Sequence, residues 1–113
     1  MNILTEYRKG IMFFRIKGYL DKITYKNLEE EINVLIDNCG VNNIVINLEE
    51  VSKIDMKGIS TLYHIYECIK KLNGSIYIYL GNNEMKNTLK SVRVFNYMDL
   101  IESELKAFDL VKI

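Results

Sequence analysis

Residues 44–48, Ile-Val-Ile-Asn-Leu, restrict the fold of this chain more than any other segment. The run is short, β-branched and almost wholly apolar, which is typical of a central strand that is buried on both faces. Amphipathic helix patterns lie on both sides of it, over residues 24–39 and 58–72. Because strands that are separated by helices need crossover connections, we expect this strand to have parallel neighbours.

The rest of the chain continues the alternation of strand and helix patterns. Alternating apolar residues predict an antiparallel pair of strands that turns at Gly10, with one face of the second strand in water. Thr24 and Gly40 are the expected start and stop of the first helix. In chain order, we expect strands over residues 3–8 and 11–17, a helix over 24–39, a strand over 44–48, a helix over 58–72, a strand over 75–80, a helix over 84–92, a strand over 98–101 and a helix from 103 towards 110. The prediction is an α/β fold in which a small mixed sheet of about four to five strands is covered by about four helices.

Length and composition describe one folded unit. The chain has 113 residues, no proline, and no repeat or linker-like tract, so residues 1–113 are expected to form a single domain. A domain of this size buries roughly two-thirds of the surface of its unfolded chain. That burial is enough for a self-sufficient core.

Charge and cysteine usage narrow the class of partner. The 15 basic and 15 acidic side chains balance, whereas proteins that bind nucleic acid or acidic membranes show a basic excess or stripe. Residues 1–10 carry charges within their only apolar stretch, so we expect no signal peptide and no membrane insertion. Cys39 and Cys68 fit neither a disulfide framework nor a paired metal spacing. The expectation is a cytoplasmic protein with reduced thiols and no nucleic-acid partner.

The sequence lacks the parts of a catalytic or metal site. Its one histidine, His64, lies on the predicted polar half of the second helix, four residues before Cys68. These two side chains can meet, but a structural zinc site needs four ligands and no second pair is nearby. There is also no phosphate-binding glycine loop and no acidic cluster of the metal-binding type. We therefore expect no enzyme activity, no metal and no cofactor.

The segment between the buried strand and the second helix is the most informative one. A loop is expected to place Asp55 directly ahead of the helix, where a carboxylate caps free backbone amides and meets the positive end of the helix dipole. Gly58 stands in the first turn, although glycine costs a helix up to about 1 kcal/mol relative to alanine. A side chain at this position would therefore obstruct either the packing of the chain itself or a partner.

Two motifs, in their order and spacing, resemble those of STAS domains, specifically of bacterial anti-sigma factor antagonists. Residues 18–21 read Gly-Tyr-Leu-Asp where that family usually has Gly-Glu-Leu-Asp, and residues 55–59 read Asp-Met-Lys-Gly-Ile where it has Asp-Ser-Ser-Gly-Leu. The likeness covers nearly the full chain and also includes Thr24, the strand at 44–48, Val51, Ile54 and Leu62. It implies a STAS-like fold and a partner-switching role. In that role the unphosphorylated protein binds an anti-sigma factor of the histidine-kinase-like ATPase class, which frees a sigma factor and so regulates transcription.

Position by position, the resemblance implies a binding surface at the second motif. Asp55 and Gly58 match the family's Asp and Gly, and Asp21 matches an acidic residue near its phosphorylation site. The phosphoacceptor serine falls on Met56 and the second serine on Lys57. Methionine has no hydroxyl, so phosphorylation at the usual position is excluded. The implied partner-binding residues are Asp21, Asp55, Met56, Lys57, Gly58 and Ile59, and the nearby hydroxyls that could substitute as phosphosites are Ser52, Ser60 and Thr61.

Alternative functions are open within the same resemblance. One is a STAS domain that binds a nucleotide or another small ligand, and another is a STAS subunit of a stress-sensing or lipid-transport complex. Tyr19 replaces the family's usual glutamate and Arg93 stands where the family often has glycine, which alters the surface that a partner would meet. The chain is expected to be a monomer or a weak homodimer.

Overall fold

The sheet of the protein has five strands in the order β1-β2-β3-β4-β5. The computed structural model describes residues 1–81 and 83–111, with the side chain of residue 83 left out. β1 pairs with β2 antiparallel, and the other neighbours pair in parallel, so the predicted mixed sheet is confirmed. The elements are β1 (Asn2–Arg8), β2 (Ile11–Leu20), α1 (Tyr25–Cys39), β3 (Asn43–Ile54), α2 (Met56–Lys71), β4 (Ser75–Tyr79), α3 (Asn83–Ser91), the 3-10 turn η1 (Val94–Asn96), β5 (Asp99–Ile101), the 3-10 turn η2 (Glu104–Lys106) and α4 (Ala107–Leu110).

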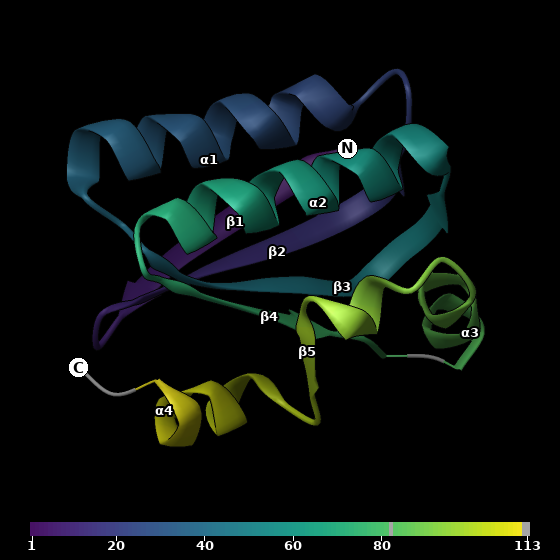
Figure 1. Ribbon diagram of the computed structural model, residues 1–113. Coiled ribbons are helices and arrows are strands. Elements are labelled where there is room, and N and C mark those ends of the chain that lie inside the picture. The colour runs from purple at the N-terminus through teal and green to yellow at the C-terminus, as the bar shows by residue number, and fades with distance from the viewer. Residues whose placement is uncertain (82, 112–113) are drawn as a thin grey trace.

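The main core lies between the sheet and the helices α1 and α2, which lie side by side over one of its faces (Figure 1). β3 is the middle strand, as the run at 44–48 predicts, and Ile44, Val45 and Ile46 are completely buried. Leu28 of α1 and Leu62 of α2 are also completely buried. Full burial of such a side chain contributes about 1.5–3 kcal/mol, so this layer accounts for much of the stability. Within the described residues, no helix has the length and apolar character that a membrane crossing requires.

Part of the second face of the sheet is covered as well, which the sequence did not predict. The strand at 11–17 was expected to have one face in water, yet Ile11 and Phe13 on that face are buried. The C-terminal turn η2 and α4 pass beneath the sheet (Figure 1) and pack Ala107 and Phe108 there. The ring centroids of Phe13 and Phe108 are 5.6 Å apart. The expectation was wrong because the covering helix is distant in the sequence and leaves no mark on the strand pattern.

The central strand is also longer than predicted. No loop precedes Asp55, because β3 continues to Ile54 and pairs there with Leu20 at the end of β2. The register between β2 and β3 shifts twice in this region, and Gly18 lies at φ 108° beside the second shift. Such bulges interrupt the two-residue alternation from which strands are recognised.

One ion-pair network fastens the C-terminal segment to the sheet. The Arg15 guanidinium donates from Nε and Nη2 to the Glu104 carboxylate, at 2.9 and 2.8 Å, and from Nη1 to Glu6 at 2.8 Å. Asn47 donates to the same Glu104 carboxylate at 2.8 Å. The bonds from Arg15 hold the pKa of Glu104 below its usual value, and those to the two carboxylates raise the pKa of Arg15.

We expect Glu104→Gln to lower the free energy of unfolding at pH 7 by about 1 kcal/mol, since the pair is partly exposed. Because the pKa of Glu104 is lowered by folding, its contribution is present above the unfolded value of about 4.3 and is lost as the pH falls through the folded pKa. Urea unfolding from pH 7 to 3 should therefore show a smaller loss of stability in this variant than in the wild type. Glu102→Gln, at an exposed position, is the control. If the free energy of unfolding fell equally with pH in the wild type and in Glu104→Gln, the stabilising role of Glu104 would be contradicted.

Candidate binding site at the start of α2

Asp55 joins three segments at one corner of the molecule. Its backbone N–H donates to the carbonyl of Leu20, at 3.3 Å. One carboxylate oxygen accepts from the backbone N–H of Gly58 at 2.9 Å, and the other accepts from that of Lys22 at 3.0 Å. These bonds, first of all that from Gly58, hold the pKa of Asp55 below its usual value. The predicted N-cap is confirmed, and the same carboxylate also holds the loop between β2 and α1.

Asp21 shapes the turn that leads into α1. One of its carboxylate oxygens accepts from the backbone N–H groups of Ile23 and Thr24, at 3.0 and 3.1 Å. Thr24 stands at the N-cap position as predicted, but its hydroxyl donates to the carbonyl of Tyr19, at 2.7 Å, and makes no capping bond to the helix. Asp21 and Asp55 therefore hold the two sides of the same corner through backbone amides.

Gly58 lies where α2 passes closest to the strands. A Cβ atom at this position would overlap the carbonyl oxygen of Leu20 and would stand 2.8 Å from Cγ1 of Ile54. The obstruction inferred from the sequence is thus the packing of the chain itself. Ile59 was expected to be at the binding surface, but it is buried in the main core and can act there only by holding α2 in place.

Met56 and Lys57 are the exposed members of the second motif. Met56 is 66% exposed, at the tip that the Asp55 cap creates. Lys57 places its ammonium 4.6 Å from the centroid of the Tyr25 ring, an attraction that offsets its unfavourable position at a helix N-terminus. Both side chains are accessible to a partner.

The predicted substitute phosphosites differ in accessibility. Ser52 and Ser60 are exposed, whereas Thr61 is buried and donates its hydroxyl to the carbonyl of Lys57, at 3.0 Å. The placement of Thr61 on the polar half of the helix was wrong. Its hydroxyl is satisfied by the helix backbone itself, so a polar residue can be buried here without interrupting the polar half of the sequence pattern.

Two more exposed apolar residues lie on the segments that meet at Asp55. Tyr19, at the end of β2, is 54% exposed, and Ile23, in the loop that Asp55 holds, is 79% exposed. We call Tyr19, Ile23 and Met56 the apolar corner. In the sequence, Tyr19 is recognisable only as a departure from the family pattern. Ile23 is not predicted at all, because a single apolar residue in a short loop belongs to no periodic pattern.

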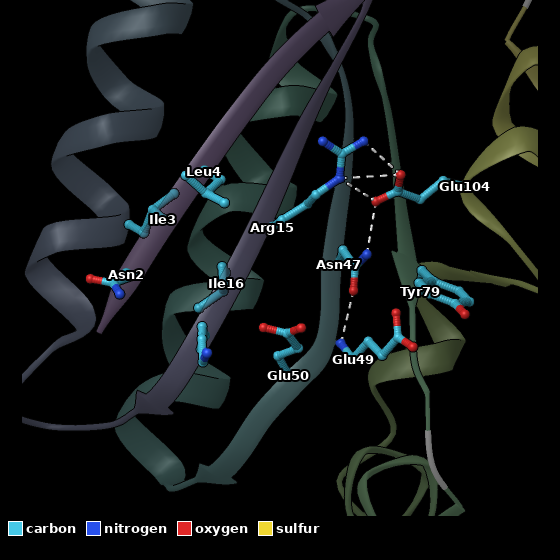
Figure 2. A pocket seen from close by; sticks show the side chains of 11 residues that line it. Asn2, Ile3, Leu4, Arg15, Ile16, Asn47, Glu49, Glu50, Tyr79 and Glu104 are labelled. Atoms are coloured by element: carbon cyan, nitrogen blue, oxygen red, sulfur yellow. Dashed lines mark hydrogen bonds and ion pairs between the residues drawn. The ribbon is translucent and has the colours of Figure 1, made fainter.

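A cavity of about 760 Å³ lies elsewhere, on the part of the second sheet face that α4 leaves open. Figure 2 shows Arg15, Asn47 and Glu104 linked at one side of it, with Glu49 and Glu50 nearby. None of the predicted site residues lines it. Three carboxylates line the cavity, against the ammonium of Lys17 and a guanidinium that is already paired with two carboxylates. The cavity is therefore poorly suited to a phosphate-bearing nucleotide.

The sheet order and the motif at the start of α2 define a class of small α/β domains. The sequence profile of the STAS domain matches residues 2–107, and the chain belongs to that family. The anti-sigma F factor antagonist of Paenibacillus polymyxa is 20% identical over 113 residues, which are 100% of this chain and 97% of that protein.

Two solved structures support the same fold. An anti-sigma factor antagonist from Mycobacterium paratuberculosis has a TM-score of 0.86 and 20% identity, over 97% of this chain and 92% of that one. The Bacillus cell fate determinant SpoIIAA in its phosphorylated form has a TM-score of 0.75 and 19% identity, over 98% of this chain and 100% of that one. The predicted STAS-like fold is confirmed.

We expect Gly58→Ala to destabilise the protein by about 1–3 kcal/mol, since the new methyl group cannot fit against the Leu20 carbonyl even though alanine favours a helix. Chemical denaturation measures the change. Ser60→Ala, at an exposed position two residues further along the same helix, is the control and should be nearly neutral. A Gly58→Ala protein as stable as the wild type would contradict the packing role.

Proposed function

We propose that the chain is an anti-sigma factor antagonist that works by binding a protein rather than by catalysis. The observation that carries the proposal is the apolar corner, which stands at the position where the family's regulatory motif falls. Three apolar side chains are exposed on segments that meet at Asp55, and exposed apolar side chains of this kind suit contact with another protein. The names of the relatives favour this role over a small-ligand sensor or a subunit of a larger complex.

The partner we propose is a cytoplasmic anti-sigma factor of the histidine-kinase-like ATPase class. Met56 and Lys57 would contact it together with Tyr19 and Ile23. The other motif residues would act indirectly, by holding the corner in shape. Asp21 and Asp55 do so through their carboxylates, Gly58 through its lack of a side chain and Ile59 through its burial.

Met56 removes the usual means of switching off this binding. A phosphoserine would bring about −1.5 to −2 charges into the interface. A thioether instead contributes about 1.5–3 kcal/mol if it is completely buried by the partner, and every 1.4 kcal/mol changes the affinity about tenfold. We therefore propose that the chain is always competent to bind, with its regulation transferred to its abundance or to its partner.

Met56→Glu should weaken binding at least about tenfold, since a buried charge opposes the contact. The measurement is the affinity, by calorimetry, for each anti-sigma factor of the proposed class that the same genome encodes. Leu105→Glu is a matched control, because Leu105 in η2 is 67% exposed against 66% for Met56 and lies in a different part of the fold. Equal affinities of wild type and Met56→Glu would contradict a role for this corner.

Met56→Ser should restore a phosphoacceptor. Incubation of this variant with the cognate kinase-like partner and ATP should add one phosphate by intact mass, whereas the wild type should gain none. A Met56→Ala protein should also gain none, which controls for loss of the thioether. A phosphate on the wild-type chain, at Ser52 or Ser60, would overturn the proposal of unswitched binding.

A further inference from the structure

The exposed side of α2 carries two metal-type ligands that the apolar corner does not use. His64 is exposed and Cys68, one helical turn later, is half-buried and has a free thiol. The Nε2 atom of His64 and the Sγ atom of Cys68 are 3.7 Å apart. His64 lies eight residues from Met56, which is about 12 Å along the helix, so this pair and the apolar corner are separate features.

The separation of the two atoms suits a shared ion. Zinc binds a thiolate at about 2.3 Å and an imidazole nitrogen at about 2.0–2.1 Å, and tetrahedral ligands at those lengths are about 3.6 Å apart. The observed 3.7 Å between Nε2 and Sγ therefore allows both atoms to reach one ion without a change in the helix.

One chain supplies half of a zinc coordination shell. Within residues 1–81 and 83–111, no group of three or more His, Cys, Asp or Glu side chains is placed to hold an ion. A structural zinc site takes four protein ligands, and two cysteines with two histidines is a common set. A second copy of the same pair completes that set. We propose that one zinc ion bridges two copies of this chain through His64 and Cys68 of each.

The chemistry of the bridge is balanced. Each Cys68 thiol loses its proton to the solvent and binds as a thiolate, while each His64 donates the lone pair of its Nε2. The two thiolates together neutralise the charge of Zn²⁺. No oxidation or reduction takes place.

The charge of Lys71 favours one arrangement of the two copies. Lys71 lies one turn beyond Cys68, so helices that cross in parallel would bring two ammonium groups together. In an antiparallel crossing at the midpoint of His64 and Cys68, each Lys71 is five residues from that midpoint in opposite directions. The two are then about 15 Å apart along the axis, at a rise of about 1.5 Å per residue. The bridge we propose therefore joins antiparallel α2 helices.

The test is a titration of the full chain with Zn²⁺, and separately with Co²⁺, followed by light scattering and absorption. We expect the molar mass to double as the metal reaches one ion per two chains. The cobalt complex should show the thiolate charge-transfer band and the strong visible absorption of a tetrahedral site. His64→Gln and Cys68→Ser should each abolish both signals, while thermal unfolding followed by circular dichroism shows that they remain folded.

Cys39→Ser is the matched control, because Cys39 is the other free thiol and is exposed at the end of α1. It should leave the stoichiometry and the spectrum unchanged. One ion per monomer without a doubling of mass would overturn the bridge. No binding at all, or an equal loss of signal in Cys39→Ser, would overturn it as well.

Discussion

Two backbone hydrogen bonds to the carboxylate of Asp55 organise the candidate site. Through them, the loop between β2 and α1 and the first turn of α2 are held by a single side chain. The close approach of Gly58 to the Leu20 carbonyl fixes the same helix against the strand beneath it. The backbone that carries the apolar corner is therefore already held in the free protein, which lowers the entropy cost of binding a partner there.

The secondary structure could be predicted wherever the local pattern decides it. The buried run at 44–48 correctly indicates the central strand, and Gly40, at φ 67°, ends the first helix as expected. Burial of Ile11 and Phe13 could not be predicted, because the helix that covers them comes from the other end of the chain. The extension of β3 to Ile54 escaped for a different reason, since bulges disturb the alternation of apolar residues.

The candidate site shows the same division. An aspartate ahead of an amphipathic helix predicts its own capping role, because the bond it makes is local in the sequence. The reason for Gly58 depends on the Leu20 carbonyl, which is distant in the sequence and close only in the fold. Ile59 was misplaced because its position in the family motif says nothing of which way its side chain points.

In the second motif, positions that maintain the fold alternate with positions that are free to contact a partner. Asp55, Gly58 and Ile59 are constrained by hydrogen bonds and packing within the chain itself. The two residues between Asp55 and Gly58 are exposed. Substitutions at the outward pair can accumulate without endangering the fold. Under the proposed function, a lineage exchanges a regulated recognition tip for a permanently active one in very few mutational steps, and the scaffold does not have to be rebuilt.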